Sequence, residues 1–190
     1  MTLPDHETLQ PWTVTGSRHV LRDRWISVRA DDCVTAEGVE IAPYYVLEYP
    51  DWVIVVAIDD QERIILVEQY RHGWGIMSLE LPTGGVEPGD ADLVAAAARE
   101  LAEETGYVSS DWRYLTALAP NPSNMANKCH FLLARSATRV VTSQDDPTER
   151  LRIVPRPVDE VVAMAKAGTI VQSMHVAALA MVLSSIGRWS

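Results

Sequence analysis

The chain has 190 residues, of which 47% are apolar, and its formal net charge is −10 at pH 7. This length suits one compact domain with room for a small appendage, and the surplus of acids argues against the phosphate backbone of a nucleic acid as the main partner. No apolar run is long enough to span a membrane, the start lacks a signal-peptide pattern, and Cys33 and Cys129 form no motif. We therefore expect a cytoplasmic protein with core thiols that binds neither nucleic acid nor membranes.

Short β elements are predicted over residues 12–50, beginning with one at residues 25–28, and a hairpin at the centre of a sheet follows them. The hairpin joins a near-continuous apolar run at residues 52–58 to residues 64–67 through a polar turn. Further strands are expected at residues 77–81, 112–115 and 130–134, and helices at about 91–105, 157–166 and 173–186. This order predicts an α/β fold in which helices cover a mixed sheet.

The helix expected at residues 91–105 follows a glycine-rich turn, and Asp90 is its expected N-cap. Inside it, Glu100, Glu103 and Glu104 stand at positions i, i+3 and i+4, which places their carboxylates on one helical face. Carboxylates this close repel one another unless a divalent cation lies among them, and oxygen ligands favour Mg²⁺ or Mn²⁺ over zinc. The competing interpretation is a Glu-rich face that is simply solvated.

The segment from Arg99 to Tyr107 reads R-E-U-x-E-E-x-G-U, where U is a bulky apolar residue, and it resembles the Nudix box. In that family a glutamate follows the glycine of the preceding turn after five intervening residues. Counting from Gly84 reaches Asp90, an acid one carbon shorter, whereas counting from Gly85 reaches Ala91. The first alignment fits the turn better, and the shorter acid is expected to affect the rate more than metal binding.

The resemblance implies an α/β/α sandwich with a mixed sheet, formed by a Nudix hydrolase domain at residues 51–190. Residues 1–50 are then an N-terminal β appendage, which in related enzymes is commonly exchanged across a homodimer. The Nudix box also implies a small-molecule substrate, a nucleoside diphosphate linked to some other group, and Mg²⁺ or Mn²⁺ as the cofactor.

Two further stretches narrow the substrate class. Gln69-Tyr70-Arg71 followed by Glu80-Leu81-Pro82 resembles a stretch of the ADP-ribose pyrophosphatases and their nucleotide-sugar relatives. Pro122 also stands at the family's distance from Gly106, although the loop at residues 123–128 departs from the family because it contains no acid. The resemblance implies hydrolysis of ADP-ribose or a related nucleoside diphosphate sugar to a nucleoside monophosphate and a sugar phosphate.

For the metal, the resemblance implies that Glu100 and Glu104 are direct ligands. Glu103 is expected to bind directly or through water, and a backbone carbonyl from the Thr83-Gly84 turn is expected to complete the protein's share of the ligands. Oxygen donors of this kind suit a hard divalent cation.

For catalysis, the resemblance implies roles for Arg99, Glu103 and Glu149. Arg99 is expected to tether a nearby acid, either Asp90 or Glu80. Glu149 matches by position the general base that related ADP-ribose enzymes carry on a mobile loop, and the competing interpretation is a solvated turn.

For the substrate, the expected contacts are Arg71, Glu80, Asn121 and Asn127. Arg71 suits a phosphate, an acid across an interface, or a plain surface ion pair. Asn121, Asn127 and His130 belong to a variant loop pattern, N-P-x-x-x-x-N-x-x-H, and suit either substrate binding or satisfaction of a turn.

Two alternatives remain open at this level. Trp52 and Trp74 suit stacking on an adenine, but aromatic residues in strands and loops more often belong to a core or an interface. For the whole chain, the alternative function is a non-catalytic Nudix module that binds a nucleotide as a sensor. A plain interaction domain leaves the Nudix-like box unexplained.

Overall fold

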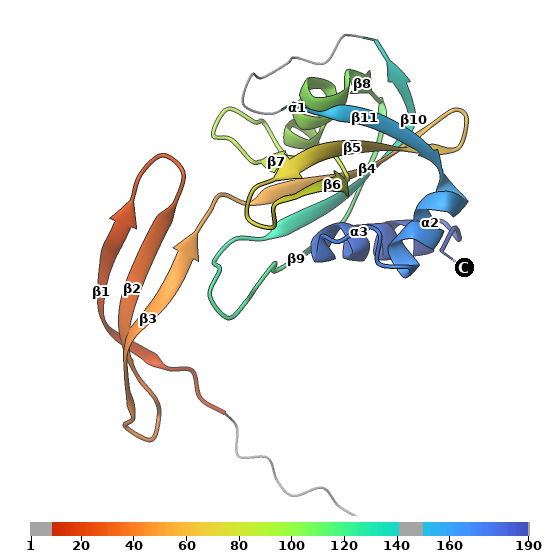
Figure 1. Ribbon diagram of the computed structural model, residues 1–190. Helices are drawn as coiled ribbons and strands as arrows, with labels where there is room; N and C mark the ends of the chain where they lie inside the picture. Colours follow the sequence, from red (N-terminus) through yellow and green to blue (C-terminus); the bar gives the residue numbers. More distant parts are fainter. Residues whose placement is uncertain (1–8, 141–149, 190) are drawn as a thin grey trace, which may run out of the picture. The chain divides into compact units, whose positions relative to one another are not determined.

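The computed structural model describes residues 9–140 and 150–189 (Figure 1). The chain divides into two compact units. We call residues 1–49 together with residues 121–127 the N-terminal unit, and the remainder of the chain the main unit.

The N-terminal unit is an antiparallel sheet of three strands, β1 (Thr13–Arg22), β2 (Ser27–Val34) and β3 (Glu40–Glu48), in the order β1-β2-β3. The loop at residues 121–127 joins it because Leu47 exchanges backbone hydrogen bonds with Asn124 and Ala126, an association that the sequence pattern did not predict. The strand expected at residues 25–28 was placed two residues too early. The Asp23 carboxylate accepts hydrogen bonds from the backbone N–H groups of residues 25 and 26 and holds them in a turn.

The main unit is built on a mixed sheet. Its central strands follow the order β11-β5-β4-β10-β8, with β6 beside β5, β7 beside β4 and β9 beside β10. β10 runs parallel to β4, and every other pairing is antiparallel, which confirms the mixed sheet. The strands are β4 (Trp52–Asp59), β5 (Arg63–Arg71), β6 (Ile76–Glu80), β7 (Thr83–Gly85), β8 (Tyr107–Val108), β9 (Asp111–Leu118), β10 (Cys129–Arg139) and β11 (Arg152–Pro157).

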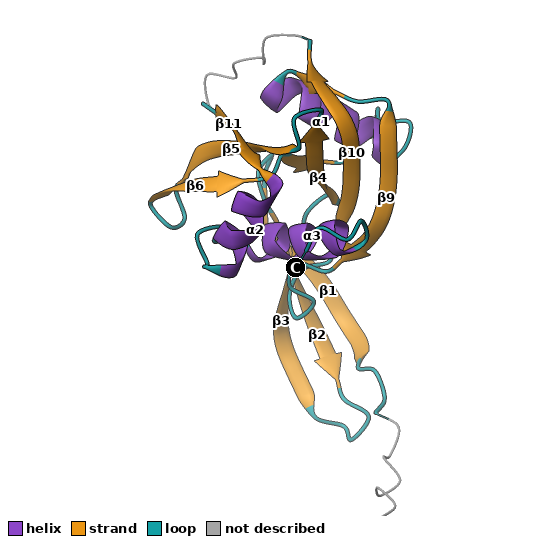
Figure 2. Ribbon diagram, turned by 90° about the vertical axis from the view of Figure 1, so that its right-hand side faces the viewer, coloured by secondary structure: helices purple, strands orange, loops and turns teal. Residues whose placement is uncertain are grey.

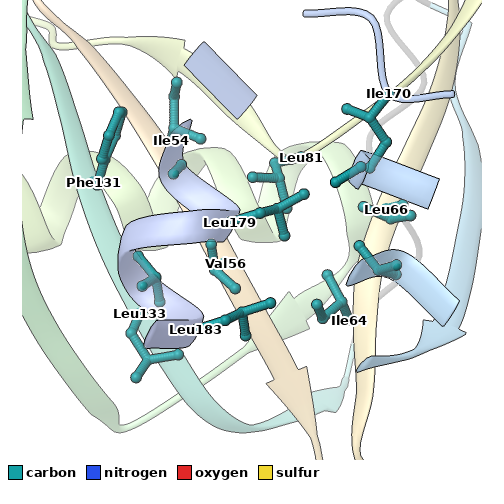
Figure 3. Packing of buried hydrophobic residues seen from close by; sticks show 14 of the residues in the cluster. Ile54, Val56, Ile64, Leu66, Leu81, Phe131, Leu133, Ile170, Leu179 and Leu183 are labelled. Carbon is teal, nitrogen blue, oxygen red and sulfur yellow. The ribbon is translucent and has the colours of Figure 1, made fainter. Parts of the chain in front are cut away.

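Helices cover both faces of this sheet, which confirms the α/β/α sandwich. α1 (Leu93–Thr105) lies on one face, and α2 (Val158–Lys166) and α3 (Ser173–Ser184) lie on the other (Figures 1 and 2). β4 reads as a near-continuous apolar run because its alternate side chains enter two cores. Val53 and Val55 pack beneath α1, whereas its neighbours pack with α3, as Figure 3 shows for Ile54, Val56, Leu179 and Leu183.

The N-cap of α1 is Asp92 and not Asp90. The Asp92 carboxylate accepts the backbone N–H of Ala95 at 2.8 Å, and Gly106 ends the helix in the left-handed conformation, with φ of 71°. Asp90 is not available as a cap because its carboxylate binds the backbone N–H of Glu87 and the Arg99 side chain. The sequence located the helix and its C-terminal end correctly but missed its start by two residues.

Both thiols of the chain are free and buried, Cys33 in the N-terminal sheet and Cys129 in the main core. Across residues 9–140 and 150–189, no helix combines the length and the apolarity that crossing a membrane requires.

Candidate active site

The site begins at a short turn between β6 and α1. β7 brings Thr83, Gly84 and Gly85 into antiparallel pairing with the start of β4, so this turn is fixed against the central sheet. The Glu100 carboxylate lies directly against Gly84. A Cβ atom at Gly84 would stand 1.9 Å from Glu100 Cδ and would push the carboxylate away, so the absence of a side chain lets this carboxylate reach the turn.

Arg99 joins the turn to the acids of α1. Its Nε and Nη2 donate to the two oxygens of Asp90, each at 3.1 Å, and Nη2 also donates to the Gly85 carbonyl at 2.9 Å. Nη1 donates to Glu100 at 2.8 Å and to Glu103 at 3.1 Å. Of the two tethers considered from the sequence, the structure shows the one to Asp90.

The two best-buried acids around Arg99 respond in opposite directions. The Arg99 guanidinium, helped by the backbone N–H of Glu87, holds the pKa of Asp90 below its usual range. Burial raises the pKa of Glu100; Arg99 opposes this rise, and the charges of Glu103 and Glu87 add to it. Asp90 is thus satisfied by its arginine, whereas Glu100 retains an unmet requirement for positive charge.

Glu104 reaches the same turn from the next turn of the helix. It is buried, and it accepts the backbone N–H of Thr83 at 3.2 Å. Glu103 lies further out, with 46% of its side chain exposed against 12% for Glu100. Two of the three carboxylates therefore face the glycine turn, and the third stands at the rim.

The three glutamates do not form a ready-made metal cluster. Among the described residues, no three His, Cys, Asp or Glu side chains converge in a metal-binding arrangement, because Arg99 draws oxygens of Glu100 and Glu103 toward itself. The donor set nevertheless fits a divalent cation. It offers only hard oxygen ligands, and the bare backbone at Gly84 already admits one carboxylate.

Arg71 and Glu80 form a pair within the chain. Glu80 is 1% exposed, and Arg71 donates to its two oxygens from Nε at 2.9 Å and from Nη2 at 2.5 Å. Burial works to raise the pKa of Glu80, but the Arg71 hydrogen bonds and the other interactions around its carboxylate together bring it below its usual value. Of the three roles considered for Arg71, the structure shows an ion pair, and its acid is buried, not on the surface.

His175 was not predicted from the sequence, yet it touches the site. This residue of α3 is 1% exposed, and its ring lies between the backbone of Leu81 and the hydroxyl of Thr83. Burial lowers its pKa to about 4, with Arg71 adding to the effect and Glu80 opposing it. The sequence signal for it was a histidine inside an apolar helix, a pattern that is as typical of a core residue as of a site residue.

A cavity of about 640 Å³ opens beside the turn. This volume lies within the range of small-molecule sites. Trp52 and Trp74 both border it, and Trp74 is 73% exposed, so its ring is not part of a core. The wall is formed by the turn, the β5–β6 hairpin and the start of α3, through Trp52, Arg71, His72, Gly73, Trp74, Ile76, Ser78, Glu80, Thr83, Gly84, Gly85, Val171, Gln172 and His175.

Asn121, Asn127 and His130 are not among the residues that line this cavity. Asn121 and Asn127 belong to the N-terminal unit, where Asn121 accepts the hydroxyl and the backbone N–H of Ser123 as a turn residue does. His130 bonds to Asp51 at 3.0 Å in the main unit and does not border the cavity. Glu149 lies outside the described residues.

Comparisons with known proteins agree with this geometry. The NUDIX domain family matches residues 48–172, and the family described as the nucleoside diphosphate sugar hydrolase N-terminal domain matches residues 12–47. The chain therefore belongs to the Nudix family and is a Nudix hydrolase. Members of this family generally use a divalent metal ion.

Individual relatives span most of the chain. An ADP-ribose pyrophosphatase of Mycobacterium tuberculosis is 30% identical, covering 91% of this chain and 81% of its own. A CMP-5'-(N-acetyl-N-hydroxy-3-aminopropyl)phosphonate hydrolase of Streptomyces rubellomurinus is also 30% identical, covering 85% of this chain and 77% of its own. The crystal structure of an ADP compounds hydrolase superposes with a TM-score of 0.83 at 28% identity, covering 96% and 99% of the two chains.

Proposed function

We propose that this hydrolase cleaves the pyrophosphate bond of ADP-ribose or a closely related nucleoside diphosphate sugar, with Mg²⁺ as its preferred ion. The observation that carries the proposal is the position of the cavity. Its wall includes Gly84 and Gly85, the same turn that receives Glu100 and Glu104. A diphosphate held at this turn would leave its nucleoside or sugar in a space bordered by Trp52 and Trp74. The names of two of the relatives above support the same substrate class.

The proposed ligands of the ion are Glu100, Glu104 and a backbone carbonyl of the Thr83-Gly84 turn, with Glu103 at the rim. When bound, the ion neutralises the diphosphate and activates the attacking water. The protein itself positions the acids that would bind the ion. Arg99 holds Glu100 against the turn and keeps Asp90 ionised, so the acids stay in place before substrate arrives.

The bond cleaved joins the two phosphorus atoms through their bridging oxygen. Water attacks one phosphorus, the other phosphate leaves with the bridging oxygen, and the products are a nucleoside monophosphate and a sugar phosphate. Glu149 is proposed to accept the proton of the attacking water. Arg71, Asn121 and Asn127 remain proposed substrate contacts, with Arg71 bound to a phosphate.

A substrate screen tests the proposal. ADP-ribose, GDP-mannose, diadenosine polyphosphates and deoxynucleoside triphosphates are compared at equal concentration, with Mg²⁺, with Mn²⁺ and with a chelator. We expect metal-dependent release of a nucleoside monophosphate from ADP-ribose or GDP-mannose, and faster turnover with Mg²⁺. A preference for the triphosphates would overturn the substrate class. Binding of ADP-ribose without turnover of any compound would favour a sensor.

We also propose that the protein is a homodimer that works in the reducing cytoplasm, where its free cysteines stay reduced. The N-terminal sheet exposes several large apolar side chains, among them Trp12, Val14, Leu21, Trp25 and Tyr45. Exposed apolar groups on so thin an element are typical of an interface. Light scattering at micromolar concentration should give twice the monomer mass, and a monomer mass would contradict the assembly.

A further inference from the structure

The Leu81–Gly85 turn is held from the α3 side by one histidine. Leu81 N–H donates to His175 Nδ1 at 3.2 Å, His175 Nε2 lies 3.2 Å from Thr83 Oγ1, and Thr83 Oγ1 lies 3.0 Å from the Leu81 carbonyl. These three contacts form a closed ring that links Leu81, Thr83 and His175. The ring joins residues that are 94 positions apart in the sequence.

Each hydrogen bond in the ring has a fixed direction. A backbone N–H can only donate, so His175 Nδ1 is an acceptor, and the proton of the neutral imidazole is on Nε2. This N–H donates to Thr83 Oγ1, and the threonine hydroxyl donates in turn to the Leu81 carbonyl. All three groups are satisfied: Leu81 and His175 are buried and Thr83 is half-buried, and an unpaired polar group in such surroundings is costly.

The turn held by this ring is the one that faces the acids of α1. Thr83 contacts His175 with its hydroxyl and Glu104 with its backbone N–H. The next residue, Gly84, lies against the Glu100 carboxylate. Any shift of the turn therefore changes the contacts of both glutamates at once. The carbonyl of the intervening proline, which accepts the N–H of Val55 at 3.0 Å, ties the turn to β4 on its other side.

We propose that His175 is a positioning residue for the hydrolase: it fixes the Leu81–Gly85 turn so that the backbone of Thr83 and Gly84 stays against Glu104 and Glu100. The inference rests on the proposed function, because it assigns to that turn a share of the divalent-ion site. Groups that orient ligands typically change metal affinity or activity by about 10- to 100-fold when removed.

The test removes each half of the contact between His175 and Thr83. Thr83→Val keeps the shape and the backbone but deletes the hydroxyl, and Thr83→Ser restores the hydroxyl. His175→Leu fills the space without polar atoms. Thr116→Val, in half-buried β9 and away from the cavity, is the control for the loss of a threonine hydroxyl.

Two readouts are needed. Mn²⁺ binding to the substrate-free protein is followed by electron paramagnetic resonance or calorimetry, and kcat and KM are measured for the best substrate. We expect Thr83→Val and His175→Leu to weaken Mn²⁺ binding and lower kcat by about 10- to 100-fold, with a smaller change in KM. Thr83→Ser should recover most of the loss seen in Thr83→Val, because it restores the hydroxyl, and Thr116→Val should stay within a few-fold of wild type. The double variant Thr83→Val/His175→Leu should bind Mn²⁺ as well as His175→Leu does and have the same kcat, because both substitutions break the same ring of hydrogen bonds.

The outcomes separate this inference from the proposed function. If the wild-type protein binds Mn²⁺ and Thr83→Val binds it equally well with an unchanged kcat, the positioning role is wrong and the proposed function stands. If the wild-type protein binds no Mn²⁺, the metal assignment fails and the positioning role fails with it. Where His175→Leu does not fold, as thermal unfolding would reveal, the comparison of Thr83→Val with Thr83→Ser decides alone.

Discussion

Two of the arginine–carboxylate groups in the main unit differ in charge balance. Arg71 donates to the two oxygens of Glu80 at 2.9 and 2.5 Å, and we call this one-to-one contact the balanced pair. Arg99 lies within 3.1 Å of three acids and 3.9 Å from a fourth, Glu87, so this group has a surplus of negative charge. A carboxylate with an arginine of its own is already compensated, whereas carboxylates that share one arginine are stabilised further by an added cation.

The difference also explains why the two acids facing the cavity and the turn shift in opposite directions. Glu80 is the more buried, yet its pKa is lowered, because the Arg71 hydrogen bonds and the other interactions around its carboxylate together outweigh burial. Glu100 must share Arg99 with other acids, and burial raises its pKa. Burial alone therefore does not set the direction of the pKa shift of these acids; the number of acids that share each arginine also matters.

The largest effect is expected from Glu104→Gln, which removes the charge of one of the two proposed direct ligands of the ion. A metal that acts as a Lewis acid contributes several kcal/mol, so we expect Mg²⁺-dependent turnover to fall by about 1000-fold. Steady-state kinetics over a range of Mg²⁺ concentrations measures it. The control is Glu160→Gln, an exposed acid of α2 that pairs with Arg156, and it should have wild-type turnover. Full activity of Glu104→Gln would remove Glu104 from the metal site.

The next largest effect concerns proton transfer, which the charge surplus does not explain. Glu149→Gln should lower kcat by at least ~100-fold, the usual contribution of a general base. The Mg²⁺ concentration that gives half-maximal activity should stay the same, because the Arg99 group is unchanged. A decrease in kcat of less than a few-fold would exclude Glu149 as the base.

Two neighbouring glycines allow a sharper test of the contact between Glu100 and the turn. An added Cβ would stand 1.9 Å from Glu100 Cδ at Gly84, but at Gly85 the nearest atom would be Pro50 Cγ at an ordinary 3.5 Å. Gly84→Ala should therefore displace the carboxylate and lower kcat roughly 100-fold, the expected cost of a misplacement of about 1 Å. Gly85→Ala should stay within a few-fold. Equal effects would contradict a specific role of the contact.

Sequence patterns were sufficient for the fold and for the acids of the site. For the acids, what is confirmed is their placement: Arg99 and the three glutamates lie on one helix, where spacing determines geometry. The apolar run of β4 identifies the centre of the sheet. The features that sequence patterns did not predict, the role of His175 and the pairing of Arg71 with Glu80, depend on long-range contacts. His175 meets Leu81 only after α3 packs on the sheet, and the balance at Arg71 depends on the pairing of β5 with β6.

The same limit explains the corrections at element ends. Asp90 has the chemistry of an N-cap, and so does Asp92, and local pattern does not choose between them. Arg99 decides the choice, because it binds Asp90 through two nitrogens and leaves Asp92 to cap the helix. One tertiary ion pair thus sets both the start of α1 and the anchoring of the upstream acid.

The smallest effect on activity, and a clear effect on stability, is expected from the balanced pair. Glu80→Gln leaves Arg71 without its charged partner, and we expect the free energy of unfolding at pH 7 to fall by about 1–3 kcal/mol. Arg71 is 48% exposed, so water compensates part of the loss. The control is Glu68→Gln, whose partner Arg152 is 71% exposed, and it should lose less than about 1 kcal/mol.

The pH dependence of the free energy of unfolding separates the charge of Glu80 from its packing. A carboxyl group whose pKa is lowered in the folded state stabilises the fold above its unfolded pKa, near 4.3 for glutamate, and this contribution is lost as the pH falls through the folded value. The gap between wild type and Glu80→Gln in urea unfolding should therefore be full at pH 7 and shrink once the pH drops below about 4. A gap that persists unchanged at low pH would mean that packing, and not the charge pair with Arg71, accounts for the stability that Glu80 contributes.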